Sequence, residues 1–414
     1  MYIEAPVIRG FLGGTMDFLR EKENVIEVSK KLLEYGLIVR TWGNISRRVS
    51  DTQFVITPSG KPYDKLTADD IVVVNIDDLS YEGDVKPSSE KGIHAECYKL
   101  RPEVNFVIHT HQMNASIVSA LGVDIKDITG RSAEIIGDEI LMGGYGLPGT
   151  KKLRTGVISA LEKTTSNAVI MAHHGALCLG KDSDEAIAVA NEVELVCAKF
   201  VLKKYKAVTG KTAESLDAVA KYIGDLFRTK EEAVKLEKYD SVRENGIMTM
   251  LDKSGNEVCI LDFDCLTEKA LTKEAGIHKA VYDRNKNINY IIHSDLPDIS
   301  AMSAKGKKMK PLLDDFAQIA GATVKSVVYK GTGRSANKIA KSFKGGRNAV
   351  ILKDNGALCC GKDKFNAEAA EMVVDKNSKA YIGAELFGNI KPINALESKL
   401  MNVVYRLKYS KQAD

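Results

Sequence analysis

The amino-acid sequence predicts an α/β protein made of two tandem units, each a central β-sheet flanked by helices. The first observation is an internal repeat: residues 90–111 match residues 274–295 at eight of 22 positions without a gap. A second pair of segments, 171–182 and 352–363, matches at seven of twelve positions in nearly the same register. The third observation is that short apolar runs alternate with helical patterns inside each unit, as in a sheet covered by helices. We therefore predict a tandem duplication of a unit of about 200 residues.

Helical and extended patterns follow each other in a regular order along the first unit. Residues 15–35 carry apolar side chains at helical spacing and are followed by Gly36, a residue type that commonly ends helices. Asp182, with Glu185 three residues later, resembles a capping box and predicts a helix to about Tyr205. Between them, short apolar runs predict strands at 54–57, 71–74, 106–108 and 168–171.

The boundary between the two units is expected between about residues 205 and 240. This stretch is charged, largely helical in pattern, and has neither proline nor a glycine/serine run. It is therefore expected to be an ordered connection rather than a flexible linker. We accordingly predict one domain over residues 1–210 and a second over residues 211–414.

Composition and charge exclude several classes of protein. The chain has 59 basic and 55 acidic residues, and its net charge of +4 is too small for an obligate nucleic-acid binder. The basic run KGKKMK at 305–310 has no interleaved aromatic residue and is expected to be a solvated loop. Nowhere do 18 apolar residues follow one another, so no membrane span is predicted. The first 14 residues carry no leader pattern and the seven cysteines form no disulfide framework, so we expect a cytoplasmic protein.

Four of the seven histidines stand at the ends of two apolar strands. In FVIHTH, His109 and His111 leave the same face of a strand, because successive side chains point to opposite faces. In AVIMAHHGAL, a second apolar strand runs into His173 and His174. Two imidazoles from one strand and a third from the next would suit a divalent metal with an open coordination position. The alternative is that these are ordinary surface or core histidines, but two such pairs together favour a metal site.

Three turns rich in small polar residues accompany the histidines. PSSE at 87–90 offers two hydroxyl groups and a carboxylate, which can hold an anion and move a proton. TWGNIS at 41–46 and TPSG at 57–60 are turns beside strands, and the backbone amides of such turns form anion-binding nests. Each of the three is also compatible with an ordinary turn.

Taken in order, these motifs resemble the class II aldolase/adducin family. The resemblance covers nearly all of residues 20–205 and returns in a degraded form over about 240–388. It implies that His109, His111 and His174 hold a catalytic divalent metal, zinc, with manganese, cobalt or iron as alternatives, and that Glu90 lies beside it as the catalytic acid–base. It further implies that the phosphate of a small phosphorylated sugar is bound by Thr41, Asn44, Ser59, Gly60, Ser88 and Ser89.

The residue after the paired serines favours one reaction of the family. Aldolase-like members carry glutamate there, as this chain does at Glu90, whereas the epimerases carry aspartate. We therefore expect a metal-dependent lyase that cleaves a ketose 1-phosphate to dihydroxyacetone phosphate and an aldehyde, with the metal stabilising an enediolate. The alternatives are a pentulose-5-phosphate 4-epimerase and a non-catalytic, adducin-like interaction module, which would lack the metal histidines.

The second copy has lost most of these residues. His293 is retained, but the other two ligand positions are Asp295 and Asn355, so a structural role is predicted for the second unit. Aldolases of the family also use a tyrosine between the two histidine motifs, and residues 112–170 contain only Tyr145, which does not align with it.

A second copy kept without its ligands suggests that it completes the site of the first. Two tandem units can imitate two adjacent subunits of a ring, so we expect a homodimer with pseudo-fourfold symmetry. The second unit is then expected to supply a wall of the site, and Tyr405 and Tyr409 are candidates for the missing proton donor.

Overall fold

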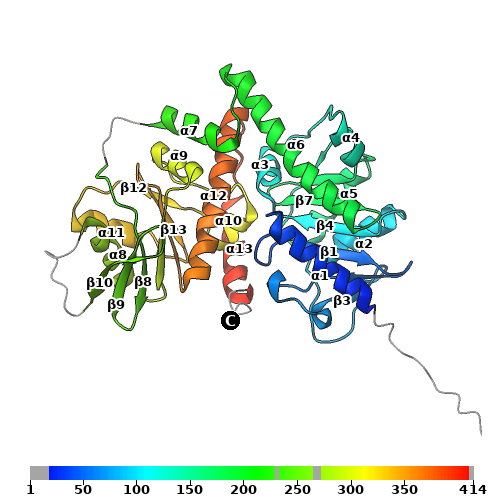
Figure 1. The fold of residues 1–414 in the computed structure, drawn as a ribbon, viewed down its shortest axis with the longest axis horizontal. Coiled ribbons are helices and arrows are strands. Elements are labelled where there is room, and N and C mark those ends of the chain that lie inside the picture. Colours follow the sequence, from blue (N-terminus) through cyan, green and yellow to red (C-terminus); the bar gives the residue numbers. More distant parts are fainter. Residues whose placement is uncertain (1–17, 229–232, 264–271, 410–414) are drawn as a thin grey trace, which may run out of the picture.

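The computed structural model describes residues 18–228, 233–263 and 272–409, without the side chains of residues 408 and 409. The N-terminal stretch for which the sequence predicts no leader lies outside the described residues. The two units lie side by side, and long helices run between them (Figure 1).

The first unit is built on a seven-stranded sheet with the order β3-β2-β1-β4-β7-β6-β5. Neighbouring strands are antiparallel, except that β5 and β6 are parallel. The four runs predicted as strands form β2, β3, β4 and β6. Of the remaining strands, β1 is too polar and β5 too short to stand out in the sequence, whereas the apolar strand β7 was not predicted. The strands are β1 (Asn44–Arg48), β2 (Gln53–Ile56), β3 (Val72–Asn75), β4 (Phe106–Thr110), β5 (Leu141–Gly143), β6 (Ala168–Met171) and β7 (Gly175–Gly180).

Helices cover both faces of this sheet. One face packs against α1 (Leu19–Glu34), α3 (Met113–Leu121) and α6 (Ser183–Thr209), and the other packs against α2 (Lys91–Leu100) and α5 (Lys151–Leu161). Strand β4 is buried on both sides because Phe106 and Ile108 face the first core while Val107 faces the second. Shorter elements, η1 (Tyr63–Lys65), η2 (Ala68–Asp70) and α4 (Arg131–Ile136), complete the unit.

The second unit repeats this plan, with the strand order β10-β9-β8-β11-β14-β13-β12. Helices α8 (Lys273–Arg284) and α11 (Gly333–Lys341) cover one face, and α9 (Pro297–Lys305), α10 (Asp314–Ile319) and α12 (Lys364–Phe387) cover the other. Its strands are β8 (Asp240–Glu244), β9 (Ile247–Leu251), β10 (Glu257–Asp262), β11 (Tyr290–Ser294), β12 (Lys325–Val327), β13 (Ala349–Leu352) and β14 (Ala357–Gly361). The predicted fold class is therefore confirmed.

The connection between the units is helical over most of its described length. Helix α6 begins at the predicted cap, where the Asp182 side chain accepts a hydrogen bond from the backbone N–H of Glu185, and extends to Thr209. Helix α7 (Leu216–Phe227) follows and packs on α9 of the second unit.

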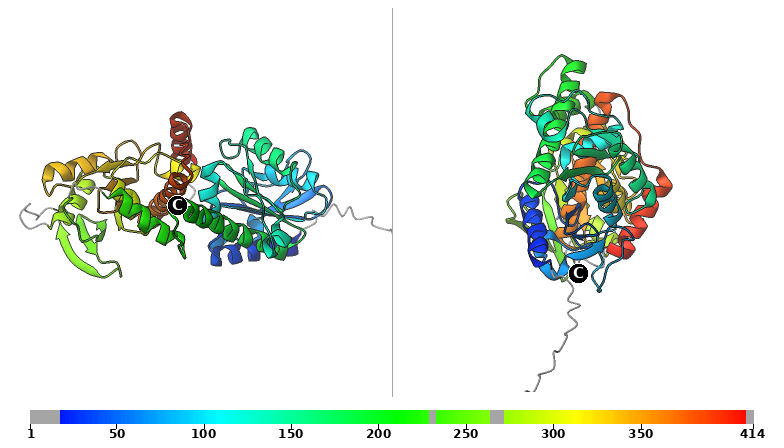
Figure 2. Two further views of the ribbon diagram at one scale, coloured as in Figure 1. Left: turned by 90° about the horizontal axis from the view of Figure 1, so that it is seen from above. Right: turned by 90° about the vertical axis from the view of Figure 1, so that its right-hand side faces the viewer.

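The two units are in direct contact along α12. This helix packs against α3 of the first unit, and the rings of Phe200 and Phe387 stack 5.3 Å apart. Seen from above, the units form two lobes joined at these helices (Figure 2). The last described elements are α13 (Ala395–Val404) and one π-helical turn, η4 (Tyr405–Tyr409), beside the first unit.

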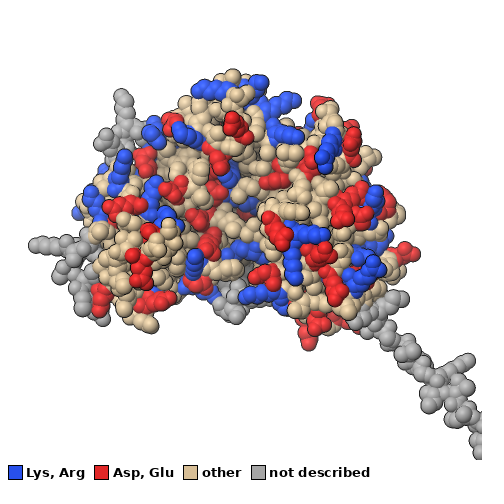
Figure 3. Space-filling model, in the orientation of Figure 1, with Lys and Arg blue, Asp and Glu red and all other residues tan. Residues whose placement is uncertain are grey.

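Three further observations concern the classes that the sequence excludes. No described helix is long and apolar enough to cross a membrane. The six described cysteines are all free. Basic and acidic side chains are interspersed over the face of the molecule in Figure 3.

Candidate active site

The three candidate metal ligands come from two neighbouring strands of the first sheet. His109 lies in β4, opposite Asn44 of β1 and Leu177 of β7, and His111 follows directly after the strand. His174 lies in the turn between β6 and β7. That turn comes very close to β4, because a Cβ atom on Gly175 would lie 2.1 Å from the backbone oxygen of Thr110. The glycine of the HHG motif is therefore required by packing.

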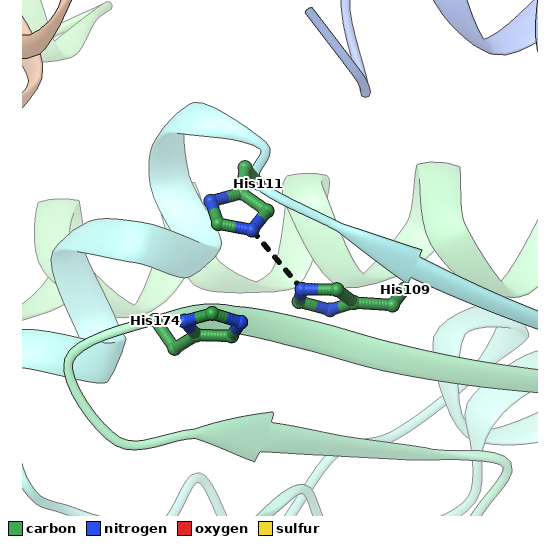
Figure 4. Close-up of side chains that lie close together, drawn as sticks. All are labelled: His109, His111 and His174. Carbon is green, nitrogen blue, oxygen red and sulfur yellow. Dashed lines mark hydrogen bonds between the residues drawn. The ribbon is translucent and has the colours of Figure 1, made fainter. Parts of the chain in front are cut away.

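The structure brings the three imidazole rings together (Figure 4). The Nε2 atoms of His109 and His111 are 3.0 Å apart, and one nitrogen from each of the three rings falls within a group whose members lie within 4.8 Å of one another. The Nδ1–H of His109 donates to the backbone oxygen of Ala176 at 2.9 Å, which leaves the Nε2 lone pair facing the other rings. The three rings thus present nitrogen atoms to a common point.

This arrangement fits a divalent metal ion. Ligand atoms at about 2.0–2.1 Å from a tetrahedral zinc ion lie about 3.3 Å from each other, close to the spacing of the His109 and His111 nitrogens. Nε2 of His174 and Oε1 of Glu90 are buried and have no hydrogen-bond partner among the described residues. Buried polar atoms are rarely left unpaired, and a cation at this point would satisfy them.

The Glu90 carboxylate lies between two of these rings. Its oxygens are 3.1 Å from Nε2 of His174 and 3.5 Å from Nε2 of His109. Burial alone would raise the pKa of Glu90, but the two histidines and a hydrogen bond from the Asn44 amide hold that pKa well below its usual range. Burial lowers the pKa of His109 in turn, so this ring stays neutral and able to bind a metal.

A side chain of the second unit also reaches this group. The Nδ1–H of His174 donates a short hydrogen bond to the buried carboxylate of Asp314, at the start of α10. Burial alone would lower the pKa of His174, but Asp314 and Glu90 raise it well above its usual value. The neighbouring Asp315 forms a buried ion pair with Lys376 at 2.7 Å and lies 3.9 Å from Nδ1 of His111.

The predicted anion-binding turns lie on one side of the histidines. The TPSG and PSSE turns are held together by a bridge between Pro58 and Pro87 and by a hydrogen bond from the Ser59 N–H to the Lys86 oxygen. Gly43 has a φ of 96°, and a Cβ atom there would lie 2.6 Å from the His109 oxygen. Only glycine therefore lets the TWGN loop approach the three histidines this closely.

A cavity of about 400 Å³ opens in front of these turns. Of the ten residues predicted for the site, His109 is buried behind the cavity and all the others line it. The second unit contributes the opposite wall, which is largely apolar. It consists of Gln318, Phe365, Leu400, Met401, Val404 and Tyr405.

His94 of α2 is a buried partner of the site that the sequence did not predict. Its ring contacts the Asn44 side-chain oxygen on one side and the Ser46 hydroxyl on the other, and Ser46 contacts the Tyr98 hydroxyl. The Asn44 amide in turn donates to Glu90 at 2.9 Å. The Asn44 side chain thus orients Glu90, a role beyond the phosphate contact that the sequence predicts for this residue. The signal in the sequence is the GIH segment at 92–94, which is repeated at 276–278.

The candidate tyrosines differ in position. Tyr405 lines the cavity. Tyr145 instead packs edge-on against the ring of His173, with ring centres 5.3 Å apart. The side chain of Tyr409 lies outside the described residues.

The equivalent site of the second unit is filled by its own chain. The Glu274 carboxylate accepts hydrogen bonds from the backbone N–H groups of Lys238 and Tyr239, at 2.7 and 3.0 Å. The Asn355 side chain makes two hydrogen bonds with the same segment: it accepts one from the Leu236 N–H and donates one to the backbone oxygen of Val234. Glu274, His278 and His293 are close enough together to hold a metal. However, both nitrogens of the His293 ring already have partners: Nδ1 contacts the Glu274 carboxylate, and Nε2 contacts the backbone oxygen of Asn355.

Comparison with known proteins identifies the family. The family model described as "Class II Aldolase and Adducin N-terminal domain" matches residues 23–201 and again residues 237–382. The chain belongs to this family. The two matches confirm the tandem duplication, and they place the second, degraded copy where the repeat predicts it.

Individual relatives are sugar-phosphate aldolases by name. The chain is 32% identical over 182 residues to a 5-deoxy-D-ribulose 1-phosphate aldolase of Bacillus thuringiensis serovar kurstaki, covering 44% of this chain and 84% of that one. It is 33% identical over 186 residues to the 5-methylthioribulose-1-phosphate/5-deoxyribulose-1-phosphate aldolase of Escherichia coli O45:K1, covering 45% and 85%. A solved L-fuculose 1-phosphate aldolase is 26% identical, covers 50% of this chain and 96% of that one, and superimposes with a TM-score of 0.43. The homology supports a lyase.

Proposed function

We propose that the protein is a divalent-metal-dependent aldolase that cleaves a ketose 1-phosphate into dihydroxyacetone phosphate and an aldehyde. The observation that carries the proposal is the convergence of three imidazoles and one carboxylate beside a cavity lined by the anion-binding turns. The 5-deoxyribulose 1-phosphate aldolases among the relatives support the substrate class. Residues 1–210 are the proposed catalytic domain, and residues 211–414 complete it.

The metal site is assigned to His109, His111 and His174. Zinc suits three imidazoles with an open position, and manganese, cobalt or iron are alternatives. When bound, the ion supplies a Lewis acid that polarises the ketone and offsets the negative charge developing on its oxygen.

The remaining residues of the site bind and orient the substrate and transfer protons. Glu90 is the proposed acid–base, because its carboxylate lies at the metal site and is held ionised by its neighbours. Tyr405, on the opposite wall, is the candidate donor of the second proton. The substrate phosphate is assigned to Thr41, Asn44, Ser59, Gly60, Ser88 and Ser89, which fix the sugar away from the bond that breaks.

The proposal extends to assembly and location. The exposed side of α13 and the following turn presents an apolar stripe, made of Leu396, Leu400, Val403, Val404 and Leu407. A second copy of the chain is the proposed occupant, because two chains of two units each would restore a pseudo-fourfold ring. Free cysteines at the six described positions are typical of a reducing compartment, which supports the cytoplasm.

The decisive experiment is a substrate screen by mass spectrometry. The protein, loaded with zinc or manganese, is incubated separately with ketose 1-phosphates and with pentulose 5-phosphates. Release of a triose phosphate supports the aldolase. An isomeric product without cleavage identifies an epimerase instead, and a chain that binds no metal under any loading condition identifies an interaction module.

A further inference from the structure

The turn that carries His174 is clamped onto the second unit at three consecutive points. The backbone N–H of Asp314 donates to the His173 oxygen at 3.0 Å, and the His173 ring donates to the Leu312 oxygen at 2.8 Å. The His174 ring donates to the Asp314 carboxylate. Two of these contacts fix the backbone on either side of the third, so the Asp314 carboxylate is held in place rather than free to sample other positions.

The segment that carries Asp314 is itself firmly anchored. Leu312, Leu313 and Phe316 are fully buried in the core of the second unit, and the Leu312 N–H donates to the Asn377 side chain of α12 at 2.8 Å. Asp314 is 1% exposed, and its second oxygen accepts the N–H of Asp315 at 2.8 Å. A buried carboxylate in this setting is a costly feature unless its partners need it.

The direction of the hydrogen bond determines which nitrogen of His174 can bind a metal. An ionised carboxylate only accepts hydrogen bonds, so Nδ1 of His174 must carry the proton. In the neutral ring, the Nε2 atom, which faces Glu90 at 3.1 Å, then presents its lone pair to the metal site. Metal-binding histidines commonly have such a carboxylate on their other nitrogen, and it raises the basicity of the ring.

We propose that Asp314 of the second unit is a positioning residue for the metal site of the first. It fixes the tautomer and the orientation of His174, so that the metal site is complete only when α10 is docked on the HHG turn. This inference rests on the proposed metal site. It assigns the degenerate copy a specific part in the chemistry, beyond a wall of the cavity.

The test measures the metal affinity of purified full-length chains by competition with a chromophoric chelator, using zinc and cobalt alone. Asp314→Asn keeps a hydrogen-bond acceptor but removes the charge, and Asp314→Leu removes both. We expect the affinity to fall in the order wild type, Asn, Leu, by about 10–100-fold overall, and the visible absorption of the cobalt form to change. Measured at a pH at which the ring is neutral, the nitrogen chemical shifts of the His174 ring should report a protonated Nδ1 in the wild type and a mixture of tautomers in Asp314→Leu.

Asp298→Asn is the matched control, because Asp298 is an equally buried carboxylate at the start of a helix of the second unit, ion-paired with Lys379. It should leave metal affinity and cobalt absorption unchanged. Metal affinity within twofold of wild type in both Asp314 variants, while His174→Ala loses the metal, would overturn the role of Asp314 and leave the proposed function intact. If the wild type binds no metal, the metal site and this inference both fail.

Discussion

Glu90 and Glu274 occupy equivalent positions at the starts of α2 and α8, and their surroundings are opposite. Glu90 faces the Nε2 atoms of two histidines, beside a cavity. Glu274 accepts two backbone hydrogen bonds from the segment that fills the corresponding space. The scaffold beneath them is the same, because a serine–histidine–tyrosine cluster supports each: Ser46, His94 and Tyr98 in the first unit, and Ser241, His278 and Tyr282 in the second.

This comparison shows how one fold can keep its packing while losing a site. The turns that carry His174 and Asn355 have the same backbone form, with the preceding residue at φ values of 62° and 58°. The ring of His293, however, is turned so that its Nδ1 meets Glu274, whereas Nδ1 of His109 meets a backbone oxygen. Loss of the site therefore needed only changes of side chains and of one loop.

Replacing histidines should have the largest effect and should differ most between the two units. The double variant His109→Ala/His111→Ala is expected to lose its metal and to lower kcat/KM by about 10³ or more, because a Lewis acid contributes several kcal/mol. His293→Ala should keep about one ion per chain and lose only stability. Metal content by elemental analysis checks both, and a metal-free His293→Ala chain would mean that the second unit is the one that binds.

Replacing the equivalent glutamates, Glu90 and Glu274, should have the next largest difference in effect. Glu90→Gln should lower kcat by about 10²–10⁴, as expected for loss of a general acid–base. Glu274→Gln should leave kcat nearly unchanged and lower the free energy of unfolding by about 1–3 kcal/mol, because its amide N–H₂ would replace one of the two accepting oxygens and face a backbone donor. Steady-state kinetics and urea unfolding of both variants test this, and equal kinetic losses would refute the assignment.

The surroundings of Asp375, a buried acid of the second unit, shift its pKa in the direction opposite to that of Glu90. Burial raises the pKa of Asp375 in α12 to about 7, although Lys379 opposes the shift. Since the folded state then binds more protons than the unfolded state, the free energy of unfolding should fall as the pH rises from about 4 to about 7. Asp375→Asn should be more stable than wild type at pH 8, by about 1–3 kcal/mol, and equal to it near pH 4.

Chemical denaturation across this pH range measures the effect. Asp283→Asn, which removes an exposed carboxylate of α8, serves as the control and should not change the pH profile. A profile of Asp375→Asn that runs parallel to that of the wild type would show that Asp375 does not titrate in this range.

Restoring the lost ligands should have the smallest effect. The double variant Asp295→His/Asn355→His rebuilds three histidines in the second unit, but it leaves the backbone of Lys238 and Tyr239 on Glu274. We expect the metal content to stay at about one ion per chain in elemental analysis. Two ions per chain would mean that the second site lost its metal through the side-chain changes alone, and not because the segment with Lys238 and Tyr239 fills it.

Much of the fold and the core of the site could be predicted from the sequence. The repeat identified two units, because buried segments such as GIH and GALC keep their residues while surfaces change. Strand alternation placed His109 and His111 on one face, and the structure brings His174 to them.

The rest depends on contacts between segments that are far apart in the chain. Asp314 lies 140 residues from His174, and only the docking of the two units brings it there. The pattern LLDDFA at 312–317, two acids inside an apolar run, was the available signal. The filling of the second site also depends on residues far apart in the sequence, because Leu236 and Asn355 are separated by 119 residues.

The helical connection through α6 and α7 has an evolutionary consequence. In a ring of identical subunits, every substitution appears at every equivalent position, so a residue that improves an interface also alters each catalytic centre. Fusing two copies into one polypeptide removes that constraint, because each half is encoded separately. One half is then free to specialise in holding the other, at the cost of half the catalytic centres per unit of mass.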